Sequence, residues 1–276
     1  MQVRPAPFTP EMENAHVRIS YQAVVVARGA ERRQAVALGE PQEGRGREVV
    51  ETGYPVPLRA NRALLIGESV GDRTPTPRQR GSMVGFIVDP FRRRKVYYES
   101  KLEKLLLTVL IAHPDVVDVA EQQRVFYHLG GERRPHWMDA VVTWKSGRRV
   151  AYPMKYSRQI KPKLRATITA IADQLGAGFA DDYRFLTEKD VHLLDAANSA
   201  KVIDCAADFD FEAQEAIKRF LGTCGPEVSL AACDAWVGDG NRGSRAAIAL
   251  VQAGLLAVPV GINVGRDAVL INRFTS

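Results

Sequence analysis

The chain has few cysteines and no long apolar run. Its three cysteines, Cys205, Cys224 and Cys233, are odd in number and lack the paired spacing of a zinc site, so we expect them to be reduced and mostly structural. No apolar stretch reaches the length needed to cross a bilayer, and the N-terminus has no signal-peptide pattern. These absences argue against a disulfide framework, a zinc protein and a membrane protein, and they predict a cytoplasmic protein.

Several common functional motifs are also missing. The segment from Gly238 to Gly243 is rich in glycine, but it lacks the preceding strand and the following lysine of a phosphate-binding loop, so we predict a turn. No internal repeat is present. Four histidines lie at unrelated spacings, which is typical of structural histidines: His113, His128, His136 and His192. Function must therefore be sought among the carboxylates and the cations.

The positive charge of the chain is concentrated. The 276 residues carry a net charge of +6 within an ordinary globular composition, and their number is enough for more than one domain. One basic cluster lies between Arg73 and Lys95 and the other between Lys145 and Arg165. Such clusters attract the phosphate backbone of DNA, although a solvated surface is the ordinary alternative. The predicted DNA contacts are Arg92, Arg93, Arg94, Lys95, Arg148, Arg149, Arg158 and Lys161.

A helix is predicted after Ser100. Leucine and valine recur at helical spacing from Leu102 to Leu110, and Pro114 ends the pattern. Glu103 lies in the first turn of this helix. It is a candidate metal ligand, but Ser100 and Glu103 also match a capping box, in which the glutamate only secures the helix start.

Strands are predicted next. We expect a strand over Val116 to Val119, a turn at residues 121–123, and further strands over Arg124 to His128, Pro135 to Trp144 and Arg149 to Tyr156. The order continues with a helix over Leu164 to Gln174, a strand over Tyr183 to Leu186, and a helix that starts near Thr187 and Asp190. This order predicts an α/β fold with a mixed sheet, which is the core order of the restriction-endonuclease-like fold.

The predicted hairpin places an aspartate beside a lysine. If residues 146–148 form its loop, Lys145 pairs with Arg149, and Asp139 falls opposite Lys155 on the same face. A change of one residue in the loop would separate these two side chains. An aspartate and a lysine in this position can also be an ordinary cross-strand ion pair.

Glu103, Asp139 and Lys155 together predict a metal-dependent DNA-cleaving centre. Carboxylate oxygens hold a hard cation such as Mg²⁺, with Mn²⁺ as a possible substitute, and an ammonium group steadies the charge that builds on phosphate. Pro153 departs from this pattern because it stands where a second strand ligand is expected. Mg²⁺ would then be held by Glu103, Asp139, the carbonyl of Met154 and water.

The last seventy residues predict a winged helix-turn-helix domain. Its helices are expected over Phe209 to Leu221, after Ser229 as far as Val237, and over Ser244 to Ala253, and its wing strands over Leu256 to Ile262 and Ala268 to Arg273. Arg242 and Arg245 at the start of the third helix can reach DNA. Because this helix is otherwise apolar, a packing or partner-docking module is an equal alternative.

The chain resembles a known family at this point. The segments Glu99-Ser-Lys-Leu-Glu103, Pro114-Asp-Val-Val117 and Glu121-Gln122, with the strands that carry Asp139 and Lys155, are similar to the TnsA family, the endonuclease subunit of heteromeric transposases. In that family a helix glutamate, a strand aspartate and a Glu or Gln two residues before a lysine make the site. Glu103, Asp139 and Lys155 correspond to these residues, and Pro153 fills the remaining position.

The resemblance implies an organisation and a role. Residues 71–205 would be the endonuclease domain, residues 206–276 the winged helix, and residues 1–70 an N-terminal extension to which we assign no function. The family cuts the 5′ strands at transposon ends in double-stranded DNA, together with a DDE-type transposase and an AAA-type ATPase regulator. Two alternatives remain open: a catalytically impaired DNA-binding adaptor of the same assembly, and a stand-alone repair or restriction nuclease.

Overall fold

The computed structural model describes residues 66–75 and 83–274. The N-terminal extension therefore lies almost wholly outside the described residues. Within them, a small hairpin of β1 (Gly85–Asp89) and β2 (Arg94–Tyr98) precedes the first helix. No helix in this part of the chain has both the length and the apolar character to cross a membrane.

Helix α1 (Lys101–Ala112) forms as its sequence predicts. The Ser100 hydroxyl accepts the N–H of Glu103 at 3.1 Å, and the last helical residue is followed by His113 and then Pro114. The helix is buried along most of its length, including Leu106, Leu110 and Ile111. It therefore lies inside the molecule, and its first turn is held firmly.

The main sheet is mixed and four-stranded, as expected. It contains β3 (Val116–Leu129), β4 (Glu132–Trp144), β5 (Arg149–Tyr152) and β6 (Asp182–Tyr183) in that order. The first pairs are antiparallel, and β5 pairs with β6 in parallel. This confirms the α/β class.

The expected turn at residues 121–123 is wrong. Strand β3 runs through it without a break, because Glu121 pairs with Ala140 and Gln123 pairs with Met138. Gln122 between them has a left-handed backbone, with φ of 50°. The polar segment contains a local irregularity at Gln122, but the strand continues through it.

The expected register of the β4–β5 hairpin is also wrong, by two residues. Thr143 pairs with Arg149, and the loop is Lys145 to Gly147, where Gly147 has φ of +83°. The N–H of Trp144 donates to the carbonyl of Arg148 at 2.9 Å. Because the error is an even number of residues, the side chains keep their faces.

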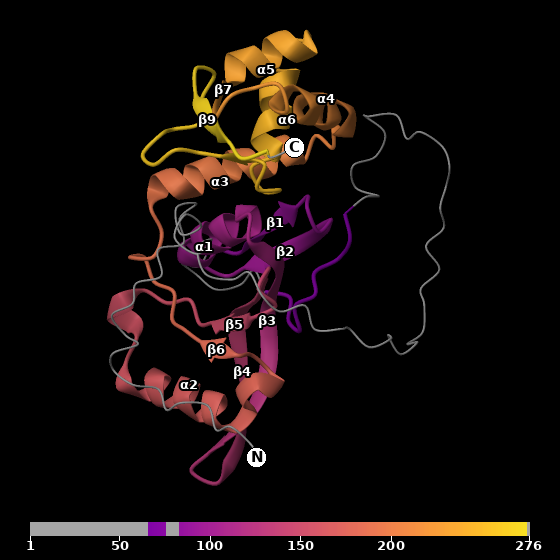
Figure 1. The fold of residues 1–276 in the computed structure, drawn as a ribbon. Helices are drawn as coiled ribbons and strands as arrows, with labels where there is room; N and C mark the ends of the chain where they lie inside the picture. Colours follow the sequence, from indigo (N-terminus) through magenta and orange to yellow (C-terminus); the bar gives the residue numbers. More distant parts are fainter. Residues whose placement is uncertain (1–65, 76–82, 275–276) are drawn as a thin grey trace, which may run out of the picture.

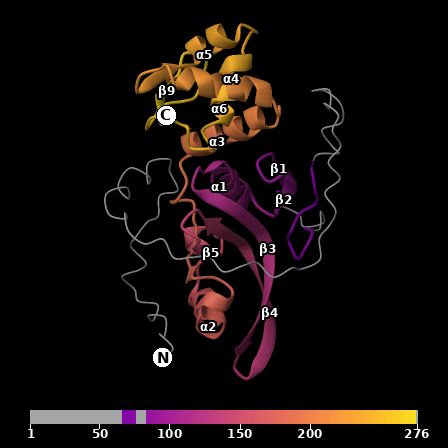
Figure 2. The same ribbon diagram turned by 45° about the vertical axis from the view of Figure 1, so that its right-hand side comes forward.

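Two apolar layers enclose the sheet. Alternate residues of β4 and β5 point to opposite sides: Ala140, Val142 and Tyr152 pack with α1, while Val141 and Ala151 pack with α2 (Pro162–Leu175). Two short 3₁₀ turns flank α2, η4 (Ser157–Gln159) and η5 (Gly176–Gly178). Beyond the reach of β5, β3 and β4 continue as a two-stranded arm, which projects away from the rest of the molecule (Figures 1 and 2).

Helix α3 (Leu193–Ala206) joins this layer to the C-terminal unit. It packs against α1 on one side and against α6 on the other (Figure 1). The helix expected from Thr187 begins later, because the N–H and hydroxyl of Thr187 both donate to the Asp190 carboxylate and form a turn. A single apolar cluster runs from α1 through α3 into the C-terminal unit.

The C-terminal unit alternates helices and strands. Its elements are α4 (Phe211–Leu221), β7 (Glu227–Ser229), α5 (Leu230–Val237), α6 (Arg242–Ala249), β8 (Leu256–Ala257) and β9 (Val269–Asn272), and its sheet order is β7-β9-β8. Ser229 caps α5 as predicted. Helix α6 starts at Arg242 and ends at Ala249, so it lies earlier than expected.

A substitution at Gly243 would test how closely α5 packs against α6. A Cβ atom there would lie 2.0 Å from the backbone carbonyl oxygen of Cys233. We expect Gly243→Ala to destabilise the protein by about 3 kcal/mol, because the clash exceeds the roughly 1 kcal/mol that alanine contributes to a helix. Urea unfolding measures the change, with Gly225→Ala as the control, since a Cβ at Gly225 meets nothing within 4 Å. Equal stability of the two variants would contradict the tight crossing.

Candidate functional site

The structure brings Glu103, Asp139 and Lys155 together. The Lys155 ammonium lies 3.0 Å from the Asp139 carboxylate and 4.0 Å from the Glu103 carboxylate. The two acids are almost fully buried, with exposed fractions of 4% and 8%, whereas the lysine side chain is 37% exposed. One cation therefore bridges two buried anions and still reaches the surface.

Glu103 serves both roles that its sequence allows. It completes the capping box, because its carboxylate accepts the N–H of Glu99 at 2.7 Å and the Ser100 hydroxyl at 3.1 Å. Burial, and then the nearby charge of Asp139, raise the pKa of Glu103 to about 7, against the opposing effect of the Glu99 N–H. This carboxyl group can therefore exchange a proton near neutral pH.

Asp139 ties β4 to the segment that follows β5. The N–H of Met154 donates to its carboxylate at 2.7 Å, and Lys155 completes the pair. Burial lowers the pKa of Lys155, but the charges of Asp139 and Glu103 outweigh it and raise that pKa overall. Lys155 therefore remains protonated at neutral pH.

Pro153 interrupts a parallel ladder beside the site. The Ala151 and Pro153 carbonyls accept the N–H groups of Arg184 and Leu186, and the N–H of Lys155 donates to the Leu186 carbonyl. An N–H at residue 153 would supply the next bond of that ladder, but proline has none. The regular strand β5 accordingly ends at Tyr152, one residue earlier.

The N–H and carbonyl of Met154 face the other way from this ladder. In an extended chain both groups of one residue point to the same side, and the N–H of Met154 points to Asp139. The carbonyl of Met154 therefore faces the edge where Asp139 lies. The predicted role of this carbonyl as a metal ligand stays a prediction.

The donor set suits a hard cation that keeps most of its water. Among the described residues, no group of three His, Cys, Asp or Glu side chains is close enough to hold a metal. Glu103 and Asp139 supply two carboxylates, and Met154 supplies a carbonyl. Mg²⁺ is commonly bound through one or two carboxylates with water and substrate phosphates. Burial and the nearby charge of Asp139 raise the pKa of Glu103. A divalent cation bound between the two carboxylates would reduce the repulsion between their charges.

A second layer of polar groups lies behind the site, and sequence reasoning missed it. Arg73 donates to the Glu99 carboxylate at 2.6 Å and to the Gln122 side-chain oxygen at 2.9 Å, and its guanidinium lies over the Trp137 ring. Gln122 is buried at the register position opposite Asp139. The left-handed backbone of Gln122 could not be predicted, because glutamine is not a residue that usually adopts this conformation. Within the described structure, Arg73 Nε, Gln122 Nε2 and Trp137 Nε1 are buried without a hydrogen-bond partner.

Part of the first basic cluster serves the fold. The Arg92 guanidinium pairs with Asp89 at 2.7 Å and donates to the carbonyls of Val116 and Val117. Arg94 pairs with Asp118, and Lys95 with Glu68. Arg92 and Arg94 are largely buried, so we correct their prediction as DNA contacts: they anchor the β1–β2 hairpin to β3.

The remaining predicted DNA contacts lie at the surface. Arg93 is exposed at the tip of the β1–β2 hairpin, Arg148 and Arg149 are exposed where β5 begins, and Arg158 and Lys161 are exposed before α2. Arg148 approaches Asp182 only at 3.4 Å. These five residues stay predicted DNA contacts, and so does Lys95, whose ammonium is partly exposed beside Glu68.

Arg242 and Arg245, at the start of α6, are each paired with two acids. Arg242 pairs with Asp210 and Glu212, and Arg245 pairs with Asp204 and Asp208. These ion pairs tie α6 to α3 and α4. The prediction that the two arginines contact DNA is therefore replaced by a structural role.

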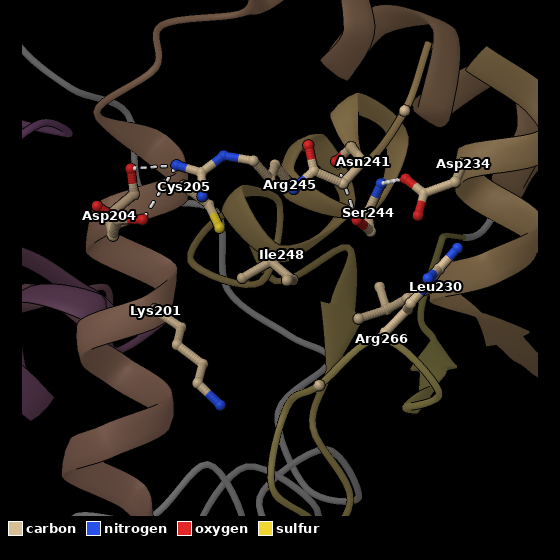
Figure 3. Close-up of a pocket in the computed structure, with 12 residues that line it drawn as sticks. Lys201, Asp204, Cys205, Leu230, Asp234, Asn241, Ser244, Arg245, Ile248 and Arg266 are labelled. Carbon is tan, nitrogen blue, oxygen red and sulfur yellow. Dashed lines mark hydrogen bonds and ion pairs between the residues drawn. The ribbon is translucent and has the colours of Figure 1, made fainter. Parts of the chain in front are cut away.

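A cavity of about 550 Å³ lies apart from the three-residue site, between α3 and the C-terminal unit (Figure 3). Lys201 and Arg245 line it, but both are bonded: Lys201 to Asn263 and the carbonyl of Val264, and Arg245 to its acids. The Asp234 carboxylate accepts the N–H of Ser244 at the start of α6. Most charges of this cavity already have partners, so we do not regard it as the functional site.

Comparison of the sequence with protein-family models and with curated proteins found no match. The function of the site must therefore be argued from its own geometry.

Glu103 makes stability depend on pH. The group has a pKa of 4.5 when unfolded and about 7 when folded, so the folded state holds the proton more tightly. The free energy of unfolding should fall as pH rises from 4.5 to 7, by about 3 kcal/mol from this group. Glu103→Gln keeps the cap and should lose most of this fall in urea unfolding with a chelator. Glu227→Gln, an exposed carboxylate, is the control, and an identical fall in both variants would contradict the shifted pKa.

Proposed function

We propose that the chain is a metal-dependent DNA endonuclease. The observation that carries this proposal is the junction of α1 and β4, where the buried carboxylates of Glu103 and Asp139 meet the ammonium of Lys155. These are the residue types that phosphodiester hydrolysis requires, and they come from elements far apart in the sequence. A buried ion cluster of this kind is also a costly choice for stability alone.

The protonation state and exposure of each residue indicate its role in the proposed reaction. Glu103 and Asp139 would hold Mg²⁺, which when bound lowers the pKa of water and polarises phosphate oxygens. Lys155 is protonated and partly exposed, so its ammonium stabilises charge on a phosphate that approaches from solvent. The Met154 N–H keeps the Asp139 carboxylate in place throughout. Glu103, with its pKa near neutrality, can take up a proton there.

The C-terminal unit supports a partner-binding role within this proposal. The order helix, strand, helix, helix and two strands supports the predicted winged helix. Its third helix, α6, is mostly buried against α3, α4 and α5, and its arginines are paired. A helix in that state is not available to enter the major groove. We propose that this unit docks the transposase or ATPase subunits that the TnsA resemblance implies, for cleavage of the 5′ strands at transposon ends.

One observation favours a second candidate, a non-catalytic adaptor of the same assembly. Pro153 supplies no side-chain oxygen ligand, and Lys155 already pairs with both carboxylates in the described structure. The three side chains then form a closed ion cluster that joins α1 to the sheet. In this alternative the protein binds DNA and partners but cuts no strand.

Substitution of Pro153 separates the two candidates. Pro153→Glu adds an oxygen ligand and a backbone N–H, while Pro153→Ala adds only the N–H, so the pair isolates the effect of the ligand. We expect Mg²⁺-dependent or Mn²⁺-dependent nicking of supercoiled DNA to rise in Pro153→Glu and to stay at the wild-type rate in Pro153→Ala. Raised metal concentration should partly replace the added ligand in the wild-type chain.

Asp139→Ala is the negative control for that assay and should abolish nicking. If no variant cuts DNA at any metal concentration while Asp139→Ala still folds, the endonuclease proposal is wrong. Equal gains in Pro153→Ala and Pro153→Glu would show that the ladder bond limits activity and that the missing oxygen does not.

A further inference from the structure

Among the described helices and strands, none packs over the outer part of one face of the β3–β4 arm. Its inner face packs Val125, Tyr127 and Met138 under α2. The opposite face, which we call the arm face, follows from the register pairs of Arg124 with Trp137, Phe126 with Pro135, and His128 with Arg133. Its members are Arg124, Phe126, His128, Arg133, Pro135 and Trp137.

The arm face is cationic and built around one aromatic ring. The guanidinium groups of Arg133 and Arg124 lie 3.9 and 5.2 Å from the centre of the Phe126 ring, which is itself 38% exposed. Both arginines are exposed, and no ion pair to an acid is found for either among the described residues. Arg134, on the inner face, is instead paired with Glu132 at 2.5 Å. The ring holds two positive charges at the surface without neutralising them.

The arm face leads directly to the candidate site. Trp137 is followed two residues later by Asp139 on β4, and Arg73 lies over the Trp137 ring. At this inner end, Arg73 Nε and Trp137 Nε1 are buried donors that have no acceptor within the described structure. From the tip of the arm toward Asp139, the chain therefore presents the cations first, then the buried donors at Arg73 and Trp137, and then the carboxylates of the site.

We propose that the arm face binds the phosphate backbone of duplex DNA and guides it to Asp139. This inference rests on the proposed endonuclease function. The part of the arm beyond β5 spans eight residues of β4 from Glu132 to Asp139, about 26 Å at 3.3 Å per residue, the length of roughly eight base pairs. A two-stranded ribbon of this kind also fits the width of the major groove. Arg124 and Arg133 bind phosphate, and Phe126 fixes their guanidinium groups.

The test is the salt dependence of DNA binding by the full chain. All proteins carry Asp139→Asn and are measured in chelator with a labelled mixed-sequence duplex, so that cleavage plays no part. Replacing Arg124 and Arg133 with Gln should weaken binding and flatten the slope of log Kd against log salt by about two, since each phosphate contact contributes roughly 0.9. Phe126→Leu should weaken binding with a smaller change of slope.

The matched control removes two cations elsewhere. Lys218→Gln with Arg219→Gln lies on α4 of the C-terminal unit, changes the net charge equally, and should leave the slope near that of the parent. Equal effects of both double variants, or a parent that binds no duplex, would overturn the arm proposal. Preference of the parent for single-stranded DNA, lost in Phe126→Leu, would also overturn it. Nicking by the chain with intact Asp139 is scored separately, so a failure of the endonuclease proposal remains distinguishable from a failure of the arm.

Discussion

The Asp139 carboxylate is the interaction on which the site depends. It is buried, so its charge requires partners, and it finds them in the Met154 N–H and the Lys155 ammonium. These two bonds hold the chain after β5 against the end of β4, although the regular pairing has already stopped at Tyr152. They also place Lys155 within 4.0 Å of Glu103 on a different element. Removing the aspartate would leave the Lys155 ammonium beside a buried glutamate without the carboxylate that now links it to β4.

This arrangement has features that stability alone does not explain. A hydrophobic replacement of a buried ion cluster is often neutral or stabilising, so such a cluster is weak support for a purely structural role. Here the cluster also raises the pKa of Glu103 to about 7 and leaves Lys155 open to solvent. Pro153 acts in the opposite direction, because it supplies neither an oxygen ligand nor a ladder bond. The cluster of two buried carboxylates and one ammonium favours the enzyme. The missing oxygen ligand at Pro153 favours the adaptor.

The sequence predicts the elements whose signals are local. The spacing of leucines, the capping box at Ser100 and Pro114 define α1, and Ser229 defines the start of α5, because each signal acts within one or two helical turns. The hairpin register could not be read with the same certainty, since it depends on which loop residue adopts positive φ, and Gly147 does so. The structural roles of Arg92 and Arg245 depend on acids and carbonyls distant in sequence. A basic cluster in a sequence does not reveal which of its charges are already paired.

Packing around α3 argues against a DNA-reading role for the third helix of the C-terminal unit. The helix lies between α1, which carries Glu103, and α6, whose apolar residues are buried against it (Figure 1). The ion pairs of Arg242 and Arg245 reinforce the same contacts around α6. An appended DNA reader would keep its third helix exposed and its arginines free, but here both are used to join the unit to the core. The arm lies at the opposite end of the molecule from the C-terminal unit (Figure 2). Asp139 lies on β4 where the arm begins. The cations of the arm face have no acidic partner among the described residues, whereas the two arginines of α6 are paired with acids and join that helix to α3 and α4.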